Sequence, residues 1–144
     1  MRSKEYLLQI YKLDKLIQAK LDEIQRLKSS AISSSMPVTE KVQSSPRGDR
    51  LEKTVAAYVD MEGELYQDLI DIQAQRREIL DTMAMLPGIE YAIIYDLYVN
   101  YLPINIVEEK MDRSYSFVSK RHSRGLKRIQ EILDERNERT KGGN

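Results

Sequence analysis

The chain of 144 residues has no cysteine, no tryptophan and one histidine. The absence of cysteine excludes disulfides, thiolate metal ligands and cysteine nucleophiles, and a single histidine argues against a histidine-rich zinc site. No apolar run approaches the roughly 18 residues that a membrane-spanning helix needs. The first 15 residues are polar and amphipathic and lack the apolar core of a signal peptide. We therefore expect a soluble cytoplasmic protein with no membrane partner.

Sequence signatures of enzyme chemistry are also missing. The chain has no glycine-rich phosphate loop, no nucleophile elbow and no metal-ligand box. His122 falls on an apolar helix face, so we interpret it as a partly buried histidine with one hydrogen bond. A group of acidic residues lies in the middle of the chain: Asp60, Glu62, Glu64, Asp68 and Asp71. Apart from Glu62, which falls on the helix seam, we interpret them as a solvated helix face. We therefore expect neither an enzyme nor a cofactor.

The net charge is zero, but the charges are segregated along the chain. Residues 51–83 and 88–112 carry net charges of −5 and −4, whereas residues 2–28 carry +3. Residues 113–128 contain six basic residues and no acidic one. A basic block of this density in a neutral protein favours a polyanionic partner for that segment. The alternative interpretation, a solvated helix face, is equally consistent with the charge pattern alone.

Two long segments repeat apolar residues at spacings of three and four, near residues 3–28 and 50–85. Such spacing predicts two helices that lie along each other or along a partner. The serine-rich segment 29–50 between them has two prolines and no sustained periodicity, which predicts a mobile loop. The two helices would then form an antiparallel hairpin, and a homodimer through this hairpin is compatible with the same stripes.

The stripes of the two helices match when paired positions sum to 82. In this register Lys20 meets Glu62, so the two polar residues in the seams coincide. A slip of one heptad would place Lys20 beside Leu69 and leave a charge in an apolar layer. We therefore expect this polar layer to select the register.

A Leu-Pro-Gly break at residues 86–88 is followed by three shorter helical segments, near 88–100, 103–111 and from after Ser114 to about Arg136. The expected inward faces are Ile89, Ala92, Ile93, Leu97 and Tyr98 in the first, and Tyr115, Val118, His122, Gly125, Leu126, Ile129 and Leu133 in the third. The predicted fold class is all-α, with an N-terminal antiparallel helical hairpin (1–86), a C-terminal helix-turn-helix domain (87–136) and a polar tail (137–144).

Two short helices joined by the turn Asp112-Arg113-Ser114, the second strongly basic, are typical of a DNA-binding helix-turn-helix. The second helix of such a motif enters the major groove with small polar side chains at its start and cations beyond them. The candidates for base contact are Ser116, Phe117, Ser119 and Lys120. The candidates for phosphate contact are Arg121, Arg124, Lys127 and Arg128.

Residues 93–129 (IIYDLYVNYLPINIVEEKMDRSYSFVSKRHSRGLKRI) resemble region 4 of bacterial sigma-70-type factors, most clearly over VSKRHSRGLKRI at 118–129. In its architecture the whole chain resembles the phage-encoded ArpU-like and RinA-like late-gene transcription regulators of Gram-positive hosts. The resemblance implies sequence-specific control of phage or prophage genes through promoter-proximal double-stranded DNA in the bacterial cytoplasm. By position it implies groove contacts from Ser116, Phe117, Ser119 and Lys120, supported by Arg121, Arg124 and Lys127.

Two other functions fit the same sequence features. The basic helix could dock on an acidic surface of RNA polymerase or of another protein. Small terminase subunits, which serve in phage DNA packaging, also combine helix-turn-helix and coiled-coil elements. Measuring the salt dependence of DNA binding distinguishes DNA recognition from docking on a protein. Determining the number of subunits distinguishes a transcription regulator from a packaging component.

Overall fold

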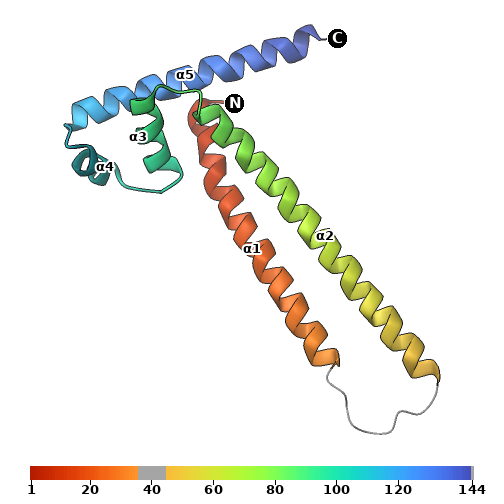
Figure 1. Ribbon diagram of the computed structural model, residues 1–144. Helices are drawn as coiled ribbons and strands as arrows, with labels where there is room; N and C mark the ends of the chain where they lie inside the picture. The colour runs from red at the N-terminus through yellow and green to blue at the C-terminus, as the bar shows by residue number, and fades with distance from the viewer. Residues whose placement is uncertain (36–44, 144) are drawn as a thin grey trace. The chain divides into compact units, whose positions relative to one another are not determined.

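The computed structural model describes residues 1–35 and 45–143, and within these ranges every regular element is a helix (Figure 1). The helices are α1 (Ser3–Ser35), α2 (Ser45–Met83), α3 (Gly88–Tyr98), α4 (Ile104–Met111) and α5 (Tyr115–Gly142). The all-α class predicted from the sequence is confirmed.

The long helices α1 and α2 reach further into the serine-rich segment than the sequence pattern predicts. Residues 29–35 and 45–50 are helical, so the prediction of a loop over the whole of 29–50 is wrong at both ends. Serine costs a helix only a few tenths of a kcal/mol, and Pro46 lies in the first turn of α2, where proline is tolerated. The remainder of the expected loop, residues 36–44, lies outside the described residues.

Contacts divide the chain into two units, one formed by residues 1–14 with 75–144 and the other by residues 15–74. The start of α1 belongs with the end of α2 and the C-terminal helices because it contacts both α2 and α5. The Tyr6 hydroxyl bonds Thr82 Oγ1 at 3.0 Å, and the Ser3 amide donates to Gln130 Oε1 at 2.8 Å. The boundary expected from the sequence at residues 86 and 87 stays a prediction.

In the unit of residues 15–74, α1 and α2 run antiparallel. Lys20 Nζ lies 3.4 Å from Asp68 Oδ2, and Lys28 Nζ lies 3.7 Å from Glu62 Oε1. Paired positions therefore sum to 88–90, and the predicted register, with Lys20 opposite Glu62, is wrong by about one heptad. A heptad slip keeps apolar residues opposite apolar residues, so the periodicity does not resist it. The long stem of Lys20 carries its ammonium out of the seam, and the slip leaves no charge stranded.

The unit of residues 1–14 and 75–144 shows the same offset between α1 and α2. Arg76 Nε donates to Asp14 Oδ1 at 2.6 Å, and the sum of these positions is again 90. The Tyr101 hydroxyl also donates to Asp14. Partial burial and this hydrogen bond raise the pKa of Tyr101 to about 12. The apolar side chains that are almost fully buried along this part of the hairpin are Leu7, Ile10, Ile79 and Met83.

Helix α3 packs against both α4 and α5. As predicted, Ile93 and Tyr98 are buried, but Ile89 is 42% exposed and Ala92 is also exposed. Ile94 is fully buried instead. Ile94 packs against α5 at Gly125 and Ile93 lies in the core shared with α4 and α5, so the buried face of α3 is rotated from the predicted one.

Helix α5 continues to Gly142, so the expected end near Arg136 and the separate tail from 137 are wrong for the described residues. Neither glycine nor proline occurs between Arg136 and Gly142, and the basic residues of the last turn, Arg139 and Lys141, interact favourably with the helix dipole. The inward stripe of α5 also differs in part. Val118, Gly125 and Ile129 are buried as predicted, whereas Tyr115 is 61% exposed.

Candidate nucleic-acid interface

Helices α4 and α5 are joined by the three-residue turn 112–114 that the sequence predicts. Asp112 ends α4 in the left-handed conformation (φ 52°, ψ 49°), and its amide bonds the carbonyls of Glu108 and Glu109. Ser114 is the N-cap of α5, and its Oγ accepts a hydrogen bond from the Phe117 amide at 3.2 Å. A serine cap satisfies one of the free amides at a helix start, so the first residue of α5 is set by local chemistry.

A small apolar core holds the three C-terminal helices together. Ile93 of α3, Val107 of α4 and Val118 of α5 are fully buried in one cluster. Partly buried apolar side chains pack around this cluster; they are Leu97, Leu102, Ile104, Met111 and Phe117. The start of α5 is thereby fixed against α3 and α4, which gives its outer face a defined orientation in this unit.

The crossing of α5 over α3 depends on a glycine. A Cβ built on Gly125 would lie 2.5 Å from Ile94 Cδ1 and 3.3 Å from Ile94 Cγ1. Both residues are buried, so the Ile94 side chain of α3 packs directly on the α5 backbone at Gly125, in space that the Cβ of a larger residue would occupy.

The outward face of α5 is polar and basic over its first four turns. Its exposed residues recur at helical spacing and are Ser116, Lys120, Ser123, Arg124 and Lys127. Lys120, Arg124 and Lys127 form no ion pair with any described residue. Three cations and two small hydroxyl side chains are therefore available to a partner on one helix face. Among the predicted contact residues, Ser116, Lys120, Arg124 and Lys127 are brought together here.

The other predicted contact residues are engaged within the protein or partly covered. Arg121 Nη1 lies 3.2 Å from Oε1 of Glu90, whose side chain is only 8% exposed. The Phe117 ring packs on the apolar core, with the guanidinium carbons of Arg113 and Arg121 at 5.0 and 5.2 Å from its centroid. Arg121 and Phe117 thus hold α5 in place. Ser119 is half-buried.

Arg128 also has an internal partner, but a weak one. Its Nη1 lies 3.2 Å from Glu131 Oε2, and both side chains are about half exposed. An exposed pair of this kind contributes little to stability, so Arg128 can exchange Glu131 for a phosphate.

Behind this face, His122 Nε2 and the hydroxyl of Tyr98 are 2.9 Å apart. This agrees with the interpretation of His122 as a partly buried residue with one hydrogen bond. Burial, and secondarily the charge of Lys4, lower the pKa of His122. The imidazole therefore stays neutral at a pH where an exposed histidine is already protonated.

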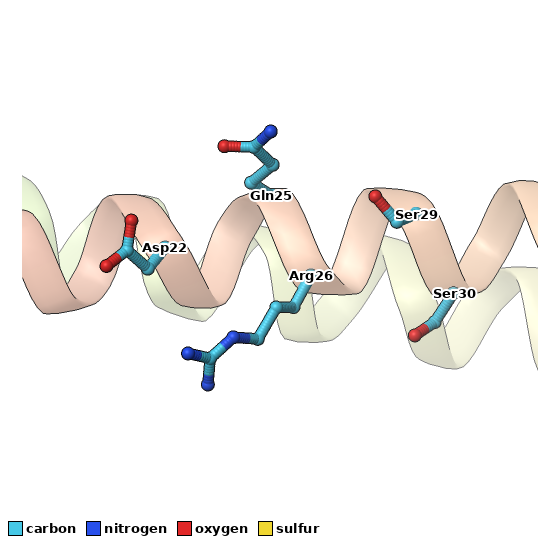
Figure 2. Close-up of a pocket in the computed structure, with 5 residues that line it drawn as sticks. All are labelled: Asp22, Gln25, Arg26, Ser29 and Ser30. Carbon is cyan, nitrogen blue, oxygen red and sulfur yellow. The ribbon is translucent and has the colours of Figure 1, made fainter.

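Two other surface depressions among the described residues lack the features of a binding site. One on α1 is lined by Asp22, Gln25, Arg26, Ser29 and Ser30 (Figure 2). All five side chains are exposed, come from a single helix and point in different directions. A site needs polar groups that converge.

A second depression, between α3 and α4, is lined by Tyr91, Tyr95, Asp96, Asn100 and Lys110 among others. Its carboxylate is already satisfied, because Asp96 Oδ1 accepts from Lys110 at 3.0 Å and from Asn100 at 2.9 Å. In the ranges 1–35 and 45–143, no group of side chains could hold a metal ion, and no helix is both long and apolar enough to cross a membrane.

Comparisons of the chain with protein-family models, with curated proteins and with solved structures find no match. The function is therefore inferred from the geometry and the chemistry of the chain's own residues.

Proposed function

We propose that the protein is a sequence-specific transcriptional regulator that binds double-stranded DNA, with the start of α5 in the major groove. The observation that carries the proposal is the exposed face of Ser116, Lys120, Ser123, Arg124 and Lys127, which begins directly after a capped three-residue turn. A helix supported in this way, with small polar residues first and cations after them, fits the groove and the phosphates beside it.

The roles of the residues follow from their places on α5. Ser116 and Lys120 lie in the first two turns, where base edges are reached, and lysine donates well to the acceptors of guanine. Arg124, Lys127 and Arg128 lie further along the helix, where their long side chains can meet phosphate oxygens. Arg121 supports this geometry by holding α5 to α3 through Glu90.

The test is the affinity for duplex DNA measured against salt, using fragments selected from the source genome. Three phosphate contacts from Arg124, Lys127 and Arg128, at about −0.9 each, contribute about −2.7 to the slope of log affinity against log salt. The variant Arg124→Ala/Lys127→Ala should weaken binding to all sequences and flatten the slope by about 1.8. Lys120→Ala should instead relax discrimination on the preferred sequence, at a cost of about 1–3 kcal/mol.

The matched control removes two cations from exposed positions on α2, in the variant Arg50→Ala/Lys53→Ala, and should leave the slope unchanged. DNA binding that does not depend on salt, or that keeps its wild-type affinity and slope in Arg124→Ala/Lys127→Ala, would contradict the proposal. Retained binding to purified RNA polymerase in the absence of DNA binding would then favour a protein-docking function. A ring of eight or more subunits would favour a packaging role.

We also propose that the regulator is a homodimer through the unit of residues 15–74. Next to its seam with α1, α2 has a second apolar stripe, formed by Val55, Val59, Tyr66 and Ile70, which are between 39% and 61% exposed. Their spacings of four, seven and four place them on one helix face. Tyr66 lies at the border of the stripe and the seam, because its hydroxyl accepts a hydrogen bond from Lys28 of α1 at 3.0 Å. A contiguous exposed apolar stripe of this kind is typical of an interaction surface.

Opposite net charges on the two helices are compatible with a second copy of the chain as the occupant of this stripe, although Lys20 and Lys28 already pair with Asp68 and Glu62 within one chain. Residues 54–74 contain five acidic residues and no basic one, whereas residues 15–35 contain four basic and two acidic residues. A two-fold arrangement can place the basic helix of each copy beside the acidic helix of the other. Val59→Glu should shift the sedimentation equilibrium toward monomer, whereas Ala57→Glu, an exposed position on another face of α2, should not. Equal effects of the two variants, or a wild-type monomer, would contradict the dimer.

A further inference from the structure

The first turn of α1 contacts α5 directly, although 127 residues separate the two contact positions. The Ser3 amide donates to Gln130 Oε1 at 2.8 Å, and Gln130 Nε2 donates to the Met1 carbonyl at 3.3 Å. Ser3 is only 8% exposed. These contacts lie within the unit of residues 1–14 and 75–144, and they fix the start of the chain against one side of α5.

A second observation links the first turn of α1 to His122 of α5. His122 precedes Gln130 by eight residues, which puts both on one side of the helix. The positive charge of Lys4 acts on His122 and lowers its pKa. The contacts of Met1 and Ser3 place the start of the chain beside Gln130 of α5, and Lys4 is near enough for its charge to act on His122.

This side of α5 adjoins the proposed DNA-contacting face. Lys127 and Gln130 are three residues apart, which separates them by only about 60° around the helix axis. Arg2 and Lys4 are both exposed, and neither side chain forms an ion pair within the described part of the chain. Arg2 and Lys4 are thus two exposed cations in the segment that is held against Gln130, on the side of α5 next to Lys127.

We propose that Arg2 and Lys4 bind phosphates of one DNA strand that borders the groove entered by α5. The major groove has a sugar-phosphate backbone on each side, and α5 alone supplies its cations from a single face. The N-terminal turn adds cations on a different side of the helix. This inference rests on the proposed DNA-binding function and extends the interface to residues far from the helix-turn-helix in sequence.

The salt dependence of DNA binding by the full chain tests this inference. Arg2→Ala/Lys4→Ala should weaken binding to all sequences and flatten the slope by about 1.8, from two contacts at about 0.9 each. Arg2→Lys/Lys4→Arg should retain the wild-type slope, because the charges remain. The thermal midpoint should stay unchanged for both variants, since the two side chains are exposed.

The failure of this inference is distinguishable from failure of the proposed function. A wild-type slope in Arg2→Ala/Lys4→Ala, together with a flattened slope in Arg124→Ala/Lys127→Ala, overturns the inference and leaves the function standing. Wild-type slopes in both variants, with DNA binding retained, overturn both.

Crosslinking provides a measurement that does not depend on affinity. The chain has no cysteine, so Lys4→Cys and Ser116→Cys each give a single attachment point for a photoactivatable probe. The probe at position 4 should crosslink to DNA backbone next to the base pairs reached from position 116. Crosslinking from position 116 but none from position 4 would overturn the inference.

Discussion

Arg121 of α5 and Glu90 of α3 form an ion pair with 3.2 Å between Nη1 and Oε1, and the Glu90 side chain is only 8% exposed. A residue that the sequence suggests as a phosphate ligand is thereby engaged by a carboxylate of the same chain. The pair joins the basic helix α5 to α3. Arg121 therefore belongs to the residues that hold α5 in place and not to those that face outward.

Arg121→Ala should lower the free energy of unfolding by about 1–3 kcal/mol. Removing one partner of a buried ion pair costs about 3–5 kcal/mol, but solvent reaches Arg121, whose side chain is 31% exposed. The matched control Arg124→Ala should change stability by less than about 0.5 kcal/mol. Urea denaturation measures both, and equal stabilities of the two variants would show that the Glu90 contact has no structural role.

Gly125→Ala should destabilise the protein by about 1 kcal/mol, although alanine is the better helix former. The new Cβ would meet Ile94, which is fully buried and has little room to shift. Gly63→Ala is the control, because a Cβ there meets no atom within 4 Å; it should stabilise by about 0.5–1 kcal/mol. Adding Ile94→Val, which removes Cδ1, should recover part of the loss at Gly125. A stabilised Gly125→Ala would mean that α3 and α5 cross less closely.

Stability should fall as the pH drops below about 6.5, the ordinary pKa of histidine. The pKa of His122 is lowered in the folded chain, so the unfolded chain takes up a proton first. The unfolded state is then favoured progressively until the folded-state pKa is passed, below which this contribution levels off. His122→Gln should remove this part of the pH dependence, measured as the difference in unfolding free energy between pH 7.5 and 5.5. The same pH dependence in wild type and variant would assign it to other groups.

The register of the hairpin can be measured by double-mutant cycles. Lys20 and Asp68 should show a coupling of about 0.2–1 kcal/mol, as expected for an exposed pair 3.4 Å apart. Lys20 and Glu62 should show a coupling near zero, because Glu62 pairs with Lys28. The opposite result would restore the register in which positions sum to 82.

Local chemistry made several features predictable from the sequence. The helical class follows from apolar spacings of three and four, and the start of α5 follows from Ser114, whose hydroxyl caps the helix wherever the helix packs. The outward positions of Ser116, Lys120, Arg124 and Lys127 follow from helical periodicity once Val118 and Ile129 are assigned to the core. Each of these properties depends on residues within a few turns of one another.

Only the tertiary structure decided properties that depend on distant residues. The heptad repeat stabilises any register that differs by seven, so the pairing of Lys20 with Asp68 depends on how the whole of α1 meets α2. Arg121 meets Glu90, which lies 31 residues earlier, and Ser3 meets Gln130, which lies 127 residues later. A charge pattern shows which residues are basic, but the packing of α3 and of the first turn of α1 against α5 determines which of those cations remain available to a partner.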